Sequence, residues 1–510
     1  MHWRIILRNI CSNWAGYAVT ALIGFFLSPF IVHSLGTTGY GLWTLVLSLT
    51  GYFGLLDFGI RSSVGRFVAR YLALNDDESG NRILSTAFAI LLGGGLLALS
   101  ATIVVVTFFF GSFHVDMHFE LAAKVALLIT GLTMSCALPL GTFSSILVAM
   151  ERFDILSGVT IIAELTRAGL IVVFLRGGHG LVSVALIALF TSIAQYVTMA
   201  LFAKALHHPL KLRVSFVDRR AFKELFGFGV FRFIWIVANQ LIFYSDAVVI
   251  GIFLGAGAIT YYAIAGTLIN YGRTFVSLVT DTFYPAATRM DAKQDLDGLR
   301  RLLIFGTRIT LLISLPLCIG FIFLGEQFIT LWMGKAYASS ALFLMVLTIP
   351  QFIGLPQYVS ALVLAGMARH RVLAYVILAE GFVNLVLSIV LVRKIGLVGV
   401  AWGTVIPDLI CTAVIIPFYT LRVLKLGVRE YVTGAFVRPV VAAVPIIGLG
   451  YGLSHLVATP SWALFGGEVA AMCGVFAILS YFICLDSRQR AVAVGKLGNM
   501  FHPRAVVHEV

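Results

Sequence analysis

The chain has 510 residues, of which 60% are hydrophobic and only 12% charged, and its mean hydropathy is +1.00. Soluble domains average about 45–50% apolar and about 25% charged residues, so this composition excludes an ordinary soluble protein and indicates a chain that lies in lipid. The net charge of +13 follows from membrane topology, as its distribution along the chain indicates, and we do not infer nucleic-acid binding from it.

Apolar segments long enough to cross a bilayer follow one another along the chain. Crossing the hydrocarbon core takes roughly 20 mainly apolar residues. The runs are uninterrupted and lack strict alternation, which favours helices over barrel strands. The sequence therefore predicts an all-α polytopic membrane protein with about 14 transmembrane helices, at residues 13–34, 40–60, 84–110, 121–143, 155–175, 180–203, 225–251, 256–284, 302–325, 339–366, 372–392, 396–421, 436–458 and 462–485.

Basic residues gather on alternate sides of the expected spans. If the N-terminus is cytoplasmic, 27 of the 36 Lys and Arg residues fall in cytoplasmic segments. The positive-inside rule then predicts a multi-pass protein with both termini in the cytoplasm. The pair Arg393-Lys394 falls on the opposite side and is the one clear exception.

An internal repeat divides the chain into two halves. Ala163-Glu164 recurs 216 residues later as Ala379-Glu380, and Leu35-Gly36 recurs 219 residues later as Leu254-Gly255. Six spans in each half give both halves the same orientation, so we expect a pseudo-two-fold axis along the membrane normal and a substrate path between the halves. The expected parts are an N-lobe at 1–205, a cytoplasmic linker at 206–224, a C-lobe at 225–422, two further spans within 423–485 and a cytoplasmic tail at 486–510.

The sequence carries no motif of an enzyme, a cofactor or a metal site. The six cysteines lie in or beside apolar segments without metal-ligand spacing. A phosphate loop, a His-Glu-x-x-His motif and a nucleophile elbow are all missing from the sequence. We therefore expect no catalytic residue, and a membrane-bound enzyme of polysaccharide or lipid synthesis is only a remote alternative because the expected external loops are short.

Two motifs near the start resemble a known family. The run Leu35-Gly36-Thr37-Thr38-Gly39-Tyr40-Gly41-Leu42-Trp43 and the later Leu56-Asp57-Phe58-Gly59-Ile60-Arg61 resemble the opening of polysaccharide-transport flippases. These are the Wzx-like branch of the superfamily that also contains the multidrug MATE exporters and the lipid II flippase. The resemblance implies movement of undecaprenyl-diphosphate-linked sugar units from the inner to the outer leaflet of a bacterial plasma membrane. It also implies glycosyltransferases and a polysaccharide polymerase as functional neighbours.

A lipid diphosphate needs cationic groups at membrane depth. Ionisable side chains there are costly and are functional candidates by default, and arginine suits phosphate because its planar fork donates parallel bonds and stays charged. Arg232 and Arg273 rank first, since they fall in the first two spans of the second half. Further candidates for substrate binding are Arg61, Arg167 and Arg308.

Three of these arginines also have structural interpretations. Arg167 follows Glu164 by three residues, which is the spacing of a neutralising pair on one helix. Arg61 follows Asp57 by four residues, the spacing of another such pair. Arg308 lies within two turns of the cytoplasmic face and could extend its charged end to the interface.

Acidic residues within the spans are candidates for coupling transport to a proton or sodium gradient. Asp246, near the outer end of the span at 225–251, is the first candidate, and Asp281 and Glu164 are the others. If the acids rather than the arginines define the cavity, a cation-coupled multidrug exporter is the alternative function. The glycan, the coupling ion and the oligomeric state stay open at this stage.

Overall fold

A computed structural model describes residues 3–207, 209, 211–456 and 461–484. Within these ranges the secondary structure consists of helices and turns, without strands. The contacts divide the chain into two compact units, Met1–Ile264 with Ala374–Pro407, and Ala265–Leu373 with Asp408–Val510. The lobe boundaries expected from the sequence stay a prediction.

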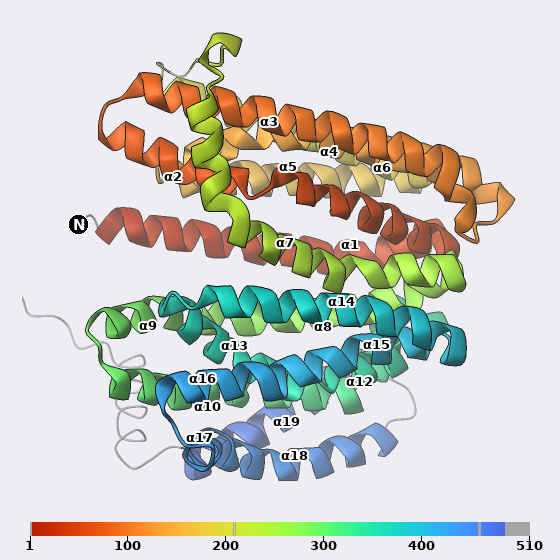
Figure 1. The fold of residues 1–510 in the computed structure, drawn as a ribbon. Helices are drawn as coiled ribbons and strands as arrows, with labels where there is room; N and C mark the ends of the chain where they lie inside the picture. The colour runs from red at the N-terminus through yellow and green to blue at the C-terminus, as the bar shows by residue number, and fades with distance from the viewer. Residues whose placement is uncertain (1–2, 208, 210, 457–460, 485–510) are drawn as a thin grey trace, which may run out of the picture. The chain divides into compact units, whose positions relative to one another are not determined.

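The first unit contains the N-terminal helices (Figure 1). Its elements are α1 (Trp3–Gly51), η1 (Tyr52–Asp57), α2 (Ile60–Ala73), α3 (Asp77–Val104), η2 (Val105–Phe109), η3 (Phe110–Ser112), α4 (Met117–Ala149), α5 (Phe153–Arg176), α6 (Leu181–Leu206), η4 (Val214–Phe216) and α7 (Arg219–Phe253). Three helices have residues in both units: α8 (Ala256–Thr280), α14 (His370–Ile395) and α15 (Leu397–Leu409).

The second unit contains the remaining elements. They are α9 (Phe283–Ala292), α10 (Leu296–Phe323), α11 (Gly325–Met333), η5 (Lys335–Tyr337), α12 (Ser340–Thr348), α13 (Gln351–Gly366), the π-helical segment η6 (Ile410–Ile415), α16 (Ile416–Leu424), α17 (Val428–Ala435), α18 (Val437–Leu456) and α19 (Trp462–Ile483). Within this unit α10 packs against α13 and α18, and α18 packs against α19.

The all-α polytopic fold predicted from the sequence is confirmed, but the count of fourteen spans is not. Among the described residues, eleven helices are long and apolar enough to cross a membrane, or twelve if α12 and α13 form one bent span. One difference arises because the first two expected spans are both counted within α1, although Gly36 (φ 71°, ψ 174°) leaves the helical conformation between them and divides α1 into two helices. The other is α8, which is long enough but carries too many polar residues to pass the same test.

The internal repeat is visible in the local backbone geometry. Gly36 and Gly255 both have positive φ angles, of 71° and 86°, at the offset of 219 residues seen in the sequence. At the same offset, Asp76 and Asp295 each cap a helix by accepting a bond from the backbone N–H three residues later, at 3.0 and 2.7 Å. The bond from Ser79 also lowers the pKa of Asp76, because it stabilises the charged carboxylate.

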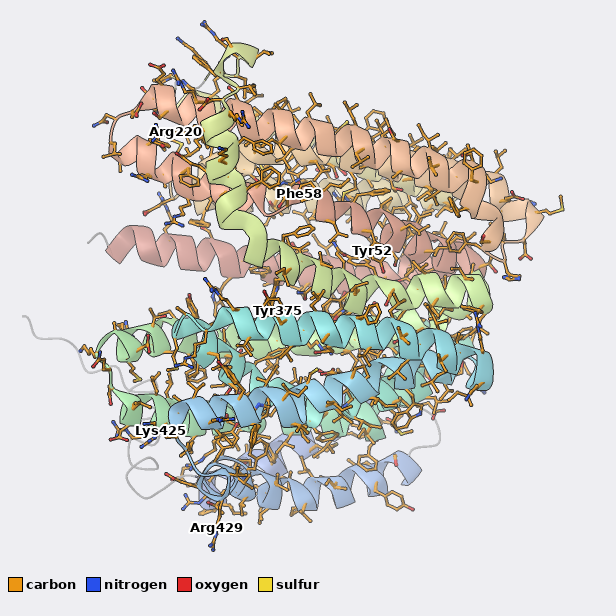
Figure 2. All side chains as sticks on the ribbon, viewed as in Figure 1. Tyr52, Phe58, Arg220, Tyr375, Lys425 and Arg429 are labelled. Carbon is orange, nitrogen blue, oxygen red and sulfur yellow. The ribbon has the colours of Figure 1, made fainter. Side chains whose placement is uncertain are left out.

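Helix α7 packs onto the N-terminal helices of the first unit. Phe58, at the break between η1 and α2, places its ring 5.8 Å from that of Phe226 and 5.4 Å from that of Phe233 (Figure 2). Its φ of 49° and the following Gly59 at 73° make a sharp turn. The Asp57-Phe58-Gly59 motif therefore has a structural role, since it ends η1, turns the chain and anchors α7.

Small residues let the helices of the first unit approach closely. Helices α3, α4, α5 and α6 run alongside one another (Figure 1). At the contact of α3 with α4, a β-carbon added to Gly95 would overlap the carbonyl oxygen of Ser135, and one added to Gly131 would overlap the Thr102 side chain. In lipid, helix association depends on such close packing because lipid tails are as apolar as the side chains.

We expect Gly95→Ala to lower the free energy of unfolding by about 1–3 kcal/mol, because the added methyl group separates α3 from α4. Gly93→Ala is the matched control on the same helix, since a β-carbon at Gly93 meets nothing within 4 Å. Thermal unfolding of both variants in detergent measures the difference. Equal unfolding temperatures would show that the α3–α4 contact does not need a glycine here.

Candidate functional site

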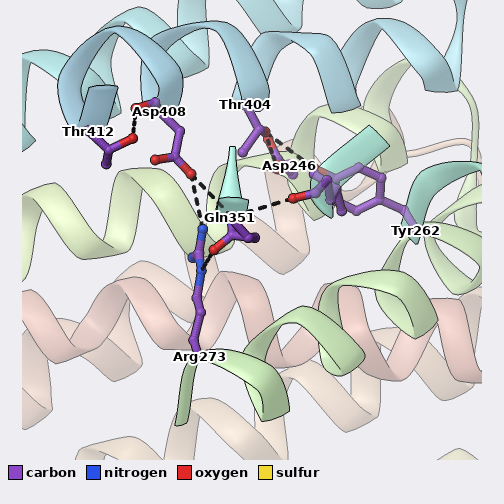
Figure 3. A network of polar contacts seen from close by, with 8 residues as sticks. Asp246, Tyr262, Arg273, Gln351, Thr404, Asp408 and Thr412 are labelled. Carbon is purple, nitrogen blue, oxygen red and sulfur yellow. Dashed lines mark hydrogen bonds and ion pairs between the residues drawn. The ribbon is translucent and has the colours of Figure 1, made fainter. Parts of the chain in front are cut away.

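A buried carboxylate surrounded by hydroxyl groups lies within the first unit. Asp246 of α7 is 5% exposed and accepts hydrogen bonds from Tyr262 of α8 at 2.6 Å, Thr404 of α15 at 2.9 Å and Ser388 of α14 at 3.4 Å (Figure 3). We call these four residues the Asp246 cluster. Among the described residues, no cationic side chain is paired with Asp246. The carboxylate is therefore stabilised by neutral donors alone.

An arginine held by an amide and a carboxylate lies within the second unit. Arg273 of α8 donates from Nε to Oε1 of Gln351 at 3.0 Å and from Nη2 to Oδ2 of Asp408 at 3.2 Å (Figure 3). Gln351 also donates from Nε2 to the same Asp408 oxygen at 3.4 Å, so the three side chains form a closed triangle. We call Arg273, Gln351, Asp408 and Thr412 the Arg273 cluster.

Both partners of Arg273 lie where a helix is irregular. Gln351 is the first residue of α13, directly after Pro350, where the direction of the chain changes by 46° between α12 and α13. Asp408 follows Pro407 in α15 and stands just before the π-helical segment η6. Thr412 donates to the carbonyl oxygen of Asp408 at 2.6 Å. Broken helices and π-helical turns are frequent where membrane proteins bind substrates.

Arg61 and Arg308 both donate to backbone carbonyl groups of neighbouring helices. Arg61 of α2 donates from Nη2 to the Ala137 oxygen at 2.7 Å, and its Nε lies 3.5 Å from Oδ1 of Asp57. Arg308 of α10 donates from Nε to the Gly434 oxygen of α17 at 3.0 Å. These contacts tie helices together, so each arginine has a structural role whether or not it also meets a substrate.

Arg167 is neutralised on its own helix. Its Nη1 lies 3.0 Å from Oε1 of Glu164, and the guanidinium also donates to Thr191 at 3.1 Å and to Ser192 at 3.3 Å on α6. The ion pair predicted from the three-residue spacing is therefore present. Glu164 therefore forms an ion pair with an arginine, whereas Asp246 accepts hydrogen bonds from neutral hydroxyl groups.

Two further candidates stand apart from both clusters. The backbone of Arg232 lies in α7, but its side chain lies outside the described residues. Asp281 falls in the exposed turn between α8 and α9. The described part of the chain thus brings Asp246 and Arg273 into polar clusters and leaves Asp281 at a surface.

Comparison with known proteins decides the family. The family model described as "Polysaccharide biosynthesis protein" matches residues 6–291, which is more than half of the chain. The chain belongs to the polysaccharide biosynthesis protein family. The resemblance seen in the two N-terminal motifs is thereby confirmed.

Relatives of this polysaccharide biosynthesis protein match over most of their length. The membrane protein EpsK of Bacillus subtilis is 22% identical over 494 residues, which cover 95% of this chain and 97% of EpsK. A Shigella flexneri protein named as an O-antigen transporter is 24% identical over 401 residues, covering 78% of this chain and 93% of its own.

Solved structures show the same fold. The lipid II flippase MurJ in an inward closed conformation has a TM-score of 0.71 at 17% identity and covers 94% of this chain and 98% of its own. An inward-facing multidrug resistance MATE transporter of the MOP superfamily has a TM-score of 0.65 at 13% identity, covering 80% and 95%. The chain is therefore a multi-pass membrane protein that shares its fold with these two structures.

Sequence reasoning alone did not single out six of the eight residues in the two clusters. Asp408 was visible as an acid within a span, but its partner Arg273 is 135 residues away. For Gln351, the sequence offered one signal: the residue directly follows Pro350, a proline inside the expected span at 339–366. Tyr262, Ser388, Thr404 and Thr412 are ordinary residues of apolar segments, and nothing in the sequence marks them as members of a site.

The pair of Glu164 and Arg167 can be tested by removing one charge or both. We expect Arg167→Gln to lower the free energy of unfolding by about 1–3 kcal/mol, because Glu164 is left partly buried without its cation. Glu164→Gln combined with Arg167→Gln should recover most of that loss. Thermal unfolding of the two variants beside the wild type measures it, and a double variant less stable than the single one would contradict a mainly structural role.

Proposed function

We propose that this protein is a flippase that moves undecaprenyl-diphosphate-linked oligosaccharide repeat units from the inner to the outer leaflet of a bacterial plasma membrane by alternating access. The observation that carries the proposal is Arg273, an arginine on α8 whose side chain is partly accessible, in a chain of the polysaccharide biosynthesis protein family. The name of the Shigella relative and the likeness to the lipid II flippase fold support it.

The chemistry of a lipid diphosphate explains why an arginine is the group to expect. The diphosphate is the charged part of such a substrate, and a membrane interior stabilises it only where fixed cations or donors meet it. The Arg273 side chain is 19% exposed, so a ligand can reach it. Gln351 accepts a hydrogen bond from Nε of Arg273, which holds the plane of the guanidinium in one orientation. Arg232, Arg61, Arg167 and Arg308 are secondary candidates for contact with the substrate.

We propose further that the Asp246 cluster takes up the coupling proton or sodium ion. The carboxylate has neutral neighbours whose O–H groups can donate to it, or can turn so that their oxygen lone pairs face a cation. Its four members come from α7, α8, α14 and α15, so binding there would act on four helices at once. Glu164 is a weaker candidate because Arg167 neutralises it, and Asp281 is weaker because it is exposed.

The remaining parts of the proposal concern topology and partners. Both termini lie in the cytoplasm, in line with the distribution of Lys and Arg. The substrate is supplied by glycosyltransferases on that side and consumed by a polymerase on the other. The chain itself acts as a transporter and not as an enzyme.

A cation-coupled multidrug exporter is the second candidate function. The observation in its favour is the buried acid of the Asp246 cluster, together with the fold likeness to a MATE transporter. An exporter would leave lipid-linked sugars unchanged when its gene is deleted and would make the deletion strain sensitive to cationic drugs.

The proposal is tested in a strain lacking the gene. We expect undecaprenyl-linked repeat units to accumulate and surface polysaccharide to disappear. Wild-type protein should restore export, whereas Arg273→Ala should reduce it at least about tenfold, a rise of about 1.4 kcal/mol or more in the transport barrier, because the diphosphate loses its cation. Extracted lipid-linked sugars and surface polysaccharide are the two measurements.

Two further variants serve as controls for this test. Arg429→Ala removes an arginine that is exposed on α17 (Figure 2) and should export normally. Arg273→Gln with Asp408→Asn removes both charges of the pair, so that no buried carboxylate is left without its partner. Normal export by Arg273→Ala or by this double variant would refute the role of Arg273, and drug sensitivity with unchanged lipid pools would favour the exporter.

Coupling is tested by Asp246→Asn, which keeps the shape of the side chain and removes its charge. In proteoliposomes we expect transport by this variant to lose its dependence on an ion gradient, while the exposed Glu430→Gln keeps it. Separate proton and sodium gradients identify the ion. A response of Asp246→Asn to the gradient that equals the wild-type response would remove Asp246 from the coupling mechanism.

A further inference from the structure

Asp408 binds Arg273 at the place where a substrate phosphate would have to bind. The Asp408 side chain is almost fully buried, with 9% exposed, whereas the Arg273 side chain keeps 19%. Burying a carboxylate beside an arginine neutralises the arginine. A site meant to attract a diphosphate therefore contains an anion of its own.

The bond between the two side chains is of a kind that a better ligand can replace. It joins one arginine nitrogen to one carboxylate oxygen at 3.2 Å. Paired, parallel bonds between the two forks are the stronger arrangement, and their usual length is about 2.7–2.9 Å. A diphosphate has more acceptor oxygens and more charge than a carboxylate, so it can make the paired contact that Asp408 does not make.

The helix that carries Asp408 is irregular on both sides of this residue. Pro407 lacks the N–H group that would continue the α-helical bonding. The π-helical segment η6 begins two residues after Asp408, and Thr412 donates to the Asp408 carbonyl oxygen at 2.6 Å. A π-helical turn contains more residues than an α-helical turn, so a change between the two forms rotates the residues beside it. Asp408 thus lies on a stretch whose backbone hydrogen bonding departs from the α-helical pattern on both sides.

We propose that Asp408 is an internal competitor for the substrate diphosphate: it occupies Arg273 in the empty protein and is displaced from it when the diphosphate binds. This inference rests on the proposed function and adds a residue that sets substrate affinity. Two anions on one buried cation repel each other, so diphosphate binding and the Asp408 bond exclude one another. Rotation at η6 moves the displaced carboxylate away.

The competitor makes release possible. A transporter must bind its cargo strongly enough to load it and weakly enough to let it go on the other side. An arginine buried without a counter-ion would hold a diphosphate tightly in a medium of low dielectric constant. The return of Asp408 to Arg273 replaces the departing phosphate, so the guanidinium is paired before and after transport.

The test measures binding of radiolabelled undecaprenyl diphosphate to the full-length protein in phosphatidylcholine nanodiscs. Asp408→Asn keeps the shape and removes the competing charge, so we expect its Kd to fall at least about fivefold, the lower end of typical coupling between two sites. Asp408→Glu keeps the charge and should bind within about twofold of the wild type. Glu468→Gln, which removes another carboxylate that is 6% exposed, is the matched control and should also bind like the wild type.

Gln351→Glu is the opposite change, because it adds a second anion beside Arg273 without altering the size of the side chain. It should weaken binding at least about fivefold, and it decides the question if Asp408→Asn does not fold. Unchanged or weaker binding by Asp408→Asn, or unchanged or tighter binding by Gln351→Glu, would overturn the competitor. If instead the wild type does not bind the lipid, or Arg273→Gln binds it equally well, the proposed function fails at Arg273 and the competitor fails with it.

Discussion

The need to satisfy every backbone polar group inside lipid governs this protein. A hydrocarbon medium offers no water to an unpaired N–H or C=O group, so the described chain consists of helices. Side chains donate to carbonyl groups at particular places on those helices. Thr412 bonds to the Asp408 carbonyl, Arg61 to that of Ala137 and Arg308 to that of Gly434. The same requirement therefore explains both the fold and the roles of two of the arginines.

The two polar clusters differ in the sign of the ligand that suits them. Asp246 has neutral hydroxyl neighbours, so its negative charge is available to a cation. Arg273 is already paired with a carboxylate, so an anion reaches it by exchange. Both clusters draw side chains from α8 and α15, which are thus the two helices that carry groups for both ligands.

The sequence predicted fourteen spans, whereas eleven or twelve of the described helices are long and apolar enough to cross a membrane. The sequence contains part of the reason for this difference. Gly36 adopts a positive φ angle of 71° with an extended ψ of 174°, so it divides α1 into two helices at the first two expected spans. Helix α8 carries Thr260, Tyr262 and Arg273, whose polar groups face partners in the protein. Hydropathy records that these residues are polar but not that their polarity is satisfied, so it counts α8 differently from its neighbours.

The sequence by itself determined the class, the helices, the repeat and the family, because composition, periodicity and offsets are properties of the chain as written. It also determined the pair of Glu164 and Arg167, since a spacing of three residues places two side chains together on any α-helix. Only the tertiary structure decided that Arg273 meets Asp408 and Gln351. Those residues are 135 and 78 positions away, and contacts at such separations depend on how helices pack, which no local rule of spacing contains.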